Sequence, residues 1–146
     1  MKKKLLHQSQ PILMIEDSED DFYATKRAFG KANLLNPIEH VTSGQAALEY
    51  LKSDKNRKPS IILLDLNMPG MDGRMTLDHI KHDRLLNKIP VVILTTSNDE
   101  RDVKACYELG ANTYIQKPVD FDGLIFAIKQ LKGYWFEIAI LPKEGG

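Results

Sequence analysis

Short apolar runs alternate with amphipathic stretches along this chain. The clearest runs cover residues 11–15, 61–64 and 91–94, and they are continuous and rich in β-branched side chains. Such runs are typical of strands that are covered on both faces, as in a parallel sheet. Two weaker runs, residues 38–41 and 112–116, complete a set of five predicted strands.

Helical patterns lie between and after these runs. Ser18 is a suitable N-cap for a helix over residues 19–32, whose apolar side chains share one face. Ser97 and Glu100 have capping-box spacing before a fourth helix, which we expect to stop near Gly110. The other helices are expected around residues 47–51, around residues 77–80 and over residues 121–131, with Trp135 continuing the last stripe.

Five strands that alternate with five helices predict an α/β fold. We expect a (βα)5 doubly wound domain, in which right-handed crossovers build a five-stranded parallel sheet with helices on both faces.

Composition narrows the class of protein. The 146 residues suit one domain, and 20 basic against 20 acidic side chains argue against binding to nucleic acid or anionic lipid. No apolar run is long enough for a transmembrane helix or a secretory signal, so a cytoplasmic location without membrane attachment is expected. The lone cysteine, Cys106, excludes an intramolecular disulfide and is interpreted as a packing residue.

Polar side chains follow four of the predicted strands. Glu16 and Asp17 follow the first strand, Asp65 the third and Lys117 the fifth, while Thr95 ends the fourth. In open α/β sheets the ligand lies beyond these carboxyl ends. If the first and third strands are neighbours, three carboxylates converge, and two such charges about 4 Å apart repel by roughly 4 kcal/mol. Oxygen ligands with few carboxylates favour Mg²⁺ as the counter-ion.

A cation, an ammonium and a hydroxyl around a carboxylate can hold a tetrahedral anion, which indicates phosphoryl transfer to an aspartate. A single strand-end aspartate is more often a helix cap or a solvated loop residue. Five suitable side chains at the ends of four strands favour the functional interpretation.

Four segments resemble the receiver domains of bacterial two-component response regulators. The resemblance spans residues 11–132, and its third-strand segment is a specific signature. The matching segments are Ile15-Glu16-Asp17, Leu63-Leu64-Asp65-Leu66-Asn67-Met68-Pro69-Gly70-Met71-Asp72-Gly73, Leu94-Thr95-Thr96 and Tyr114-Ile115-Gln116-Lys117-Pro118. The resemblance implies the flavodoxin-like strand order 2-1-3-4-5, an order that general accounts of this fold already give for a chemotaxis receiver.

The resemblance also implies a role for each acidic-site residue. Asp65 would accept a phosphoryl group from a histidine kinase. Asp17 and Asp65 would supply carboxylates to Mg²⁺, the backbone carbonyl of Asn67 would be a third ligand, and Glu16 would act through a water molecule.

The remaining residues would bind the phosphoryl group or change conformation when it is present. Lys117 would pair with the phosphoryl oxygens, and the bond before Pro118 would be cis. Thr95 would move to the phosphoryl group and Tyr114 would turn inward with it, which would reshape the surface of the fourth helix, fifth strand and fifth helix. The flanking residues Asn67 and Ser97 do not fix the lifetime of the phosphorylated state.

Other interpretations fit less well. A dehalogenase-type phosphohydrolase needs an acid two residues after the nucleophile, where this chain has Asn67. Flavodoxins and dinucleotide binders hold phosphate at the loop after the first strand, which here is acidic. His79 and His82 could face one metal, but a solvated helical face is favoured because no third ligand is near in sequence.

The domain layout is expected to be a tail over residues 1–10, the receiver over 11–132 and an apolar extension over 133–146, with no output domain. The extension either continues the last helix and packs on the domain or forms an interaction surface. With Leu141-Pro142, it resembles the stand-alone response regulators paired with bacterial phytochrome histidine kinases. That resemblance implies a homodimer through the fourth-helix to fifth-helix face and the extension.

The sequence thus favours a single-domain response regulator that signals through a phosphorylation-dependent protein surface. Its only catalysis would be its own phosphorylation and dephosphorylation. The alternative is a constitutive receiver-fold interaction module that dimerises independently of phosphorylation.

Overall fold

The computed structural model describes residues 10–68 and 70–138. Its strands form one parallel sheet in the order β2-β1-β3-β4-β5, as predicted. The strands are β1 (Ile12–Ile15), β2 (Ile38–Val41), β3 (Ile61–Leu64), β4 (Val91–Thr95) and β5 (Thr113–Gln116). The helices are α2 (Glu19–Lys31), α3 (Gly44–Lys52), α4 (Gly73–His82), α5 (Glu100–Glu108) and α6 (Phe121–Lys132), followed by the π-helical segment η1 (Gly133–Ile138).

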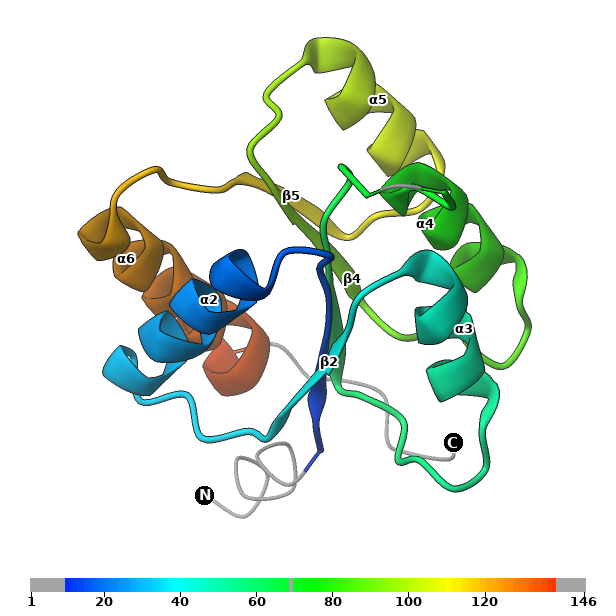
Figure 1. Cartoon of the computed structure of the whole chain (residues 1–146), viewed down its shortest axis with the longest axis horizontal. Coiled ribbons are helices and arrows are strands. Elements are labelled where there is room, and N and C mark those ends of the chain that lie inside the picture. Colours follow the sequence, from blue (N-terminus) through cyan, green and yellow to red (C-terminus); the bar gives the residue numbers. More distant parts are fainter. Residues whose placement is uncertain (1–9, 69, 139–146) are drawn as a thin grey trace.

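Helices cover both faces of the sheet (Figure 1). Helices α2 and α6 lie on one face, and α3, α4 and α5 lie on the other. Successive side chains of a strand point to opposite faces, so β1 feeds both cores. Leu13 and Ile15 pack in the core under α3, α4 and α5, whereas Ile12 and Met14 pack in the core under α2 and α6.

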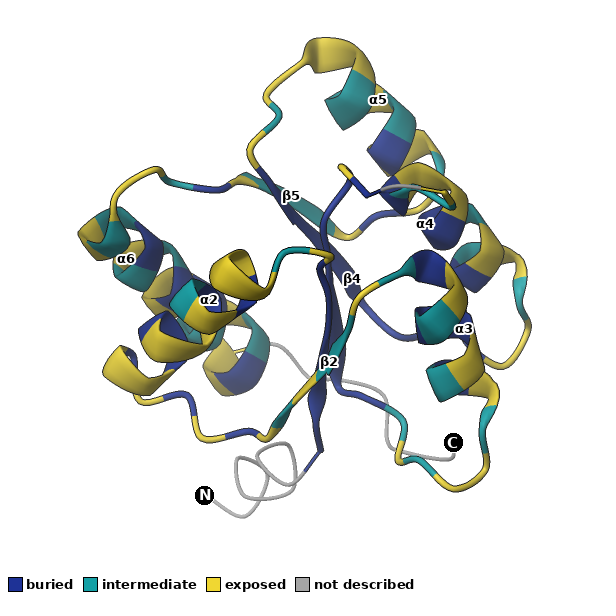
Figure 2. Ribbon diagram, viewed as in Figure 1, coloured by how far each residue is buried: buried dark blue, intermediate teal, exposed yellow. Residues whose placement is uncertain are grey.

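Burial explains why three strands are clear in the sequence and two are weak. Every residue of β1, β3 and β4 is buried, as continuous apolar runs predict. The edge strands β2 and β5 are half-buried, so their sequences are mixed. Figure 2 shows the buried centre of the sheet and the exposed outer faces of the helices.

The ends of the helices test the predicted caps. The hydroxyl of Ser18 accepts a hydrogen bond from the backbone N–H of Asp21, so the first cap is confirmed. The capping box at Ser97 is wrong, because α5 starts two residues later with Asp99 as its N-cap. Asp is as good a cap as Ser, and the Ser97 hydroxyl bonds to another side chain. Gly110 follows α5 with a φ of 104°, a value that favours glycine.

The described part of the C-terminal extension continues the last helix and packs on the domain, as the first interpretation expects; the interaction surface stays a prediction. Residues 133–138 continue the helix as a π-helical segment, and Phe136 is buried in the core under α2 and α6. Tyr134 and Ile138 remain exposed. Residues 139–146, which include Leu141-Pro142, lie outside the described residues.

None of the helices within the described residues has the length and apolar character needed to cross a bilayer.

Candidate functional site

The strand register brings the predicted acidic residues together. Ile15 of β1 lies beside Leu64 of β3, and the backbone N–H of Asp65 donates to the carbonyl of Ile15 at 3.1 Å. The residues that follow these strands, Glu16 and Asp17 on one and Asp65 on the other, therefore leave the sheet at the same edge. The first and third strands are neighbours, which was the condition of the sequence argument.

Glu16, Asp17 and Asp65 form an acidic cluster. Each offers a carboxylate oxygen, and these three atoms all lie within 4.8 Å of one another. Glu16 and Asp65 are buried, while Asp17 is exposed to solvent. Within residues 10–68 and 70–138, it is the only group of three acidic, histidine or cysteine side chains close enough to hold one ion. The oxygen-only donor set fits a hard divalent cation such as Mg²⁺.

Lys117 places a positive charge against this cluster. Its Nζ lies 2.9 Å from Oε1 of Glu16 and 3.6 Å from Oδ2 of Asp21, and its side chain is 9% exposed. The backbone N–H of Lys117 donates to the carbonyl of Thr95, which fixes the residue at the end of β5. Burial lowers the pKa of Lys117, but the hydrogen bond and charge of Glu16, with the charges of Asp21 and Asp65, raise it above its usual value.

Burial, more than the neighbouring charges, determines the electrostatic state of Glu16. Burial raises the pKa of Glu16 to about 7, against the opposing hydrogen bond and charge of Lys117. The charge of Asp65 adds to the rise. One ammonium thus offsets the negative charge only in part, and a divalent cation in the cluster would complete the compensation.

Asn67 follows Asp65 by two residues, and it lies next to Thr95 in space. Thr95 ends β4 fully buried, and Nδ2 of Asn67 lies 3.5 Å from its Oγ1. The metal contacts of the Asn67 carbonyl and of Glu16 through water stay predictions. Glu16 contacts Lys117 directly.

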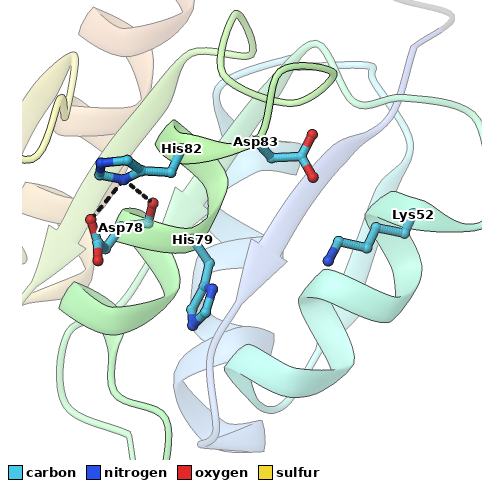
Figure 3. A pocket seen from close by; sticks show the side chains of 5 residues that line it. All are labelled: Lys52, Asp78, His79, His82 and Asp83. Carbon is cyan, nitrogen blue, oxygen red and sulfur yellow. Dashed lines mark hydrogen bonds and ion pairs between the residues drawn. The ribbon is translucent and has the colours of Figure 1, made fainter.

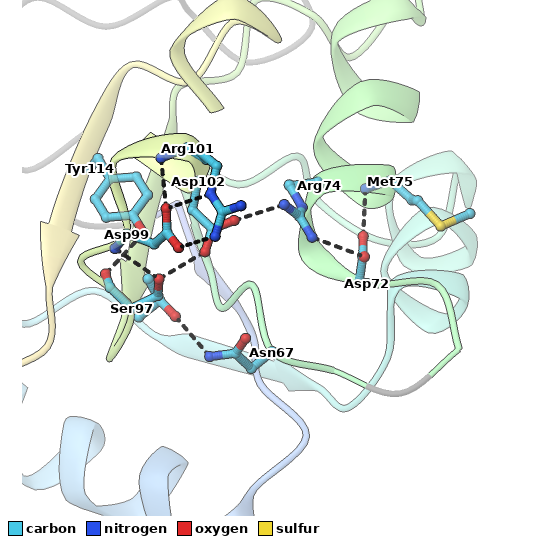
Figure 4. Close-up of polar contacts among 10 residues, drawn as sticks. Asn67, Asp72, Arg74, Met75, Ser97, Asp99, Arg101, Asp102 and Tyr114 are labelled. Carbon is cyan, nitrogen blue, oxygen red and sulfur yellow. Dashed lines mark hydrogen bonds and ion pairs between the residues drawn. The ribbon is translucent and has the colours of Figure 1, made fainter. Parts of the chain in front are cut away.

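The predicted switch residue Tyr114 is connected to the loop after β4 (Figure 4). Its hydroxyl donates to the backbone carbonyl of Ser97 at 2.9 Å. Its backbone N–H donates to the hydroxyl of Tyr107. Ser97 follows Thr95 by two residues, so the aromatic side chain on β5 contacts the loop that directly follows the buried threonine.

Two contacts of the site were missed in the sequence. Asp21, from the first turn of α2, shares the ammonium of Lys117. His40 of β2 stacks on Phe22 with ring centroids 3.9 Å apart, and its Nε2 lies 2.7 Å from the carbonyl oxygen of Glu16. Since a carbonyl only accepts, Nε2 carries the proton. The acidic run around residue 21 is evident in the sequence, but its contact with Lys117, 96 positions later, is not. No pattern in the sequence indicated a contact for His40.

Gly73 explains part of the third-strand signature. A Cβ atom at this position would lie 2.4 Å from the carbonyl oxygen of Asp65 and 2.6 Å from Cα of Leu66. The backbone N–H of Gly73 donates to the carbonyl of Leu66. Only a residue without a side chain lets α4 begin against the backbone of the central aspartate.

One expectation at the site is wrong. The bond before Pro118 was expected to be cis, but the described residues contain no cis peptide bond. The trans form is the one that X–Pro bonds generally prefer.

His79 and His82 do not form a metal site. Nδ1 of His82 lies 2.9 Å from Oδ1 of Asp78, one turn earlier on α4, and its side chain is exposed. Figure 3 shows the rings of His79 and His82 pointing in different directions around a polar surface pocket. The solvated helical face favoured from the sequence accounts for both residues.

Known proteins share this arrangement. The profile of the response regulator receiver domain matches residues 12–129. The response regulator Rcp1 of Synechocystis is 36% identical over 135 residues, covering 90% of this chain and 92% of the relative. The probable methanogenesis regulatory protein FilR2 of Methanothrix harundinacea is 36% identical over 127 residues, covering 85% of this chain and 82% of the relative.

The solved structures agree. The phosphorylated cyanobacterial phytochrome response regulator RcpA has a TM-score of 0.86 at 33% identity, covering 92% of this chain and 99% of RcpA. The Mn²⁺-bound form of Rcp1 has a TM-score of 0.83 at 35% identity, covering 91% of this chain and 99% of Rcp1. The family match, the strand order and the acidic cluster agree with one another: the chain belongs to the response regulator receiver domain family.

Proposed function

We propose that this receiver-domain response regulator accepts a phosphoryl group on Asp65 in a Mg²⁺-dependent reaction. The observation that carries the proposal is the surroundings of Asp65. Its carboxylate is buried beside Glu16 and Asp17, and Lys117 lies against the same cluster. Phosphoryl transfer adds an anionic group and needs positive charge nearby. The Lys117 ammonium supplies such charge next to the carboxylate of Asp65 and the like charges around it.

The proposed donor is a phosphohistidine of a sensor kinase. A carboxylate oxygen of Asp65 forms the new O–P bond while the P–N bond to the histidine breaks, and the released imidazole regains its ring nitrogen lone pair. The product is an acyl phosphate. Lys117 would pair with the phosphoryl oxygens in place of part of its contact with Glu16, and the Thr95 hydroxyl and Asn67 amide would donate to them.

The metal role rests on the same cluster. Asp17 and Asp65 would supply carboxylates, the carbonyl of Asn67 a third ligand, and Glu16 would act through water. A bound Mg²⁺ supplies neutralising charge to the carboxylates and to the transferred group. The short distances within the cluster support this assignment, as does the Mn²⁺-bound form of the relative Rcp1.

Phosphorylation would change the surface formed by α5, β5 and α6, and this surface would transmit the signal. Thr95 is buried at the acceptor, and Tyr114 of β5 is bonded to Ser97 in the adjoining loop. A phosphoryl group that draws the Thr95 hydroxyl would therefore also shift the bonded loop and ring.

We further propose a sensor histidine kinase of the bacterial phytochrome class as the phosphate donor. The support is likeness alone: RcpA is named as a phytochrome response regulator, and it covers 92% of this chain. A direct check is phosphotransfer from a purified phytochrome kinase against a kinase of another sensor class. Equal transfer from both would remove this assignment and leave the acceptor chemistry untouched.

Incubation with acetyl phosphate and Mg²⁺ tests the acceptor. We expect one phosphoryl group per chain, a gain of about 80 Da by mass spectrometry of the intact protein. The gain should vanish in Asp65→Asn and persist in Asp54→Asn, an exposed control on the same chain. Undiminished labelling of Asp65→Asn would exclude Asp65 as the acceptor.

A second candidate function is a constitutive dimerisation module. A surface groove lined by residues of β5, α6 and η1, among them Ile115, Leu131, Tyr134 and Trp135, favours it. Tyr134 is the residue to change, because Phe136 is part of the core. Light scattering of the wild type and of Tyr134→Ser, with and without phosphorylation, separates the candidates. A dimer that depends on Tyr134 and ignores phosphorylation would favour the module; a dimer that appears with phosphorylation would favour the switch.

A further inference from the structure

Arg74, Ser97 and Asp102 form a polar bracket between α4, the loop after β4, and α5 (Figure 4). Nη1 of Arg74 lies 2.7 Å from Oδ1 of Asp102, and the hydroxyl of Ser97 donates to Oδ2 of the same carboxylate at 2.8 Å. Asp102 thus uses one oxygen for each partner. The side chain of Asp102 is 23% exposed and that of Arg74 is 47% exposed, so the contact with Ser97 is the better shielded from water.

Both ends of the bracket lie close in the chain to residues of the acceptor site. Arg74 directly follows Gly73, which lies so close to Asp65 that a Cβ atom would overlap its carbonyl oxygen. Ser97 follows Thr95 by two residues, and its carbonyl accepts the hydroxyl of Tyr114. Nδ2 of Asn67 lies 3.5 Å from Oγ1 of Thr95, so the end of β4 also contacts the loop that follows Asp65.

We infer that Asp102 is a positioning residue for phosphoryl transfer to Asp65, acting through Arg74 and Ser97. This inference rests on the proposed function. The bracket fixes the loop after β4 relative to the first turn of α4, and so holds the Thr95 hydroxyl beside Asn67 before the phosphoryl group arrives. Preorganised donors lower the barrier because they need not reorganise during the reaction.

The bracket should affect the rate and leave metal affinity unchanged. The acidic cluster is carried by the ends of β1 and β3, whereas the Asp102 contacts lie on α4, α5 and the loop after β4. A merely structural contribution would weaken metal binding together with the rate. Loss of positioning would slow labelling at unchanged Mg²⁺ affinity.

Four variants resolve the contacts. Asp102→Ala removes both contacts, and Asp102→Asn removes the charge opposite Arg74 but keeps an oxygen that can accept from Ser97. Ser97→Ala removes only the hydroxyl, whereas Arg74→Gln removes the cation and with it the 3.9 Å ion pair of Arg74 with Asp72. We expect Asp102→Ala to be labelled by acetyl phosphate about tenfold more slowly, with the other three between it and the wild type. Arg74→Gln combined with Asp102→Asn should be no slower than the slower single variant, because the two share one contact.

Glu108→Gln is the matched control, since it breaks an exposed ion pair with Lys104 on the same helix without touching the bracket. It should label at the wild-type rate. Wild-type rates in Asp102→Ala, or a loss of Mg²⁺ affinity that parallels the loss of rate, would overturn the positioning role while Asp65 labelling stands. Absence of any wild-type labelling would overturn the proposed function itself and the inference with it.

Discussion

The ammonium of Lys117 lies 2.9 Å from Oε1 of Glu16, although 101 positions separate the two residues in the chain. Both side chains are buried, at 9% and 1% exposure. The parallel sheet makes this contact, because β1 and β5 end at the same edge. The pair holds one positive charge among the carboxylates that surround Asp65, and a buried pair of this kind is costly to break from one side only.

Lys117→Met should therefore destabilise the protein in the absence of Mg²⁺. We expect a loss of about 2–4 kcal/mol in the free energy of unfolding, because Glu16 and its neighbours lose their nearest cation. Urea denaturation measures the loss, and saturating Mg²⁺ should restore part of it. Lys104→Met, which removes an exposed ion pair on α5, should change stability by less than about 0.5 kcal/mol. Equal effects of the two substitutions would contradict a special role for the Glu16 contact.

Mg²⁺ should raise the thermal stability of the wild type through the acidic cluster. A ligand that binds only the folded state stabilises it by about 2.7 kcal/mol at a concentration 100 times its Kd. Asp17→Asn removes an exposed carboxylate, one of the proposed Mg²⁺ ligands, and one repelling charge. We expect its melting point to equal or exceed that of the wild type without Mg²⁺, and to rise little when Mg²⁺ is added. Asp20→Asn, an exposed neighbour in the first turn of α2, should keep the full response.

Sequence patterns predicted the strands and the side chains at their ends for a simple reason. Continuous burial requires continuous apolar runs, and the residue that follows a strand is fixed by the strand. The order of the strands could not be predicted in this way, because apolar periodicity does not indicate which strands pair. That order came from the resemblance to receiver domains, and the register of Ile15 beside Leu64 confirms it.

Contacts between helices could not be predicted from the sequence. Asp102 and Arg74 look like ordinary surface charges, and they meet only because α4 and α5 pack side by side. The cap of α5 was misplaced since both Ser97 and Asp99 are good caps, and the choice depends on the partner that Ser97 finds in Asp102. His40 gives no local signal because its partner is a backbone carbonyl on a neighbouring strand.

The thiol of Cys106 should be unreactive in the folded protein. It should also make the free energy of unfolding depend on pH in the alkaline range. Burial, with a smaller effect of the Asp102 charge, raises the pKa of its thiol from 9.0 to about 11. Because the unfolded chain releases this proton at lower pH, the free energy of unfolding should fall by about 2 kcal/mol as pH rises from 9 to 11.

Urea denaturation across that pH range measures the fall, and Cys106→Ala is the control that should show a shallower slope. A thiol-specific reagent at pH 8 should label the wild type only after denaturation, since the side chain is fully buried. Rapid labelling of the native protein would contradict this account.

Gly73→Ala should damage both stability and phosphoryl acceptance. The new methyl group would lie 2.4 Å from the carbonyl oxygen of Asp65, so the backbone of α4 or of the acceptor must move. We expect a loss of about 1–3 kcal/mol in the free energy of unfolding and slower labelling by acetyl phosphate.

The matched control is Gly30→Ala in α2, where the added methyl group would meet no atom within 4 Å. In a helix interior, alanine is favoured over glycine by about 0.5–1 kcal/mol, so this variant should be more stable than the wild type and should label normally. The two substitutions add the same atom to the same residue type, and only the position relative to Asp65 differs. If Gly73→Ala were as stable and as readily labelled as Gly30→Ala, the close approach of α4 to the acceptor backbone would not be required.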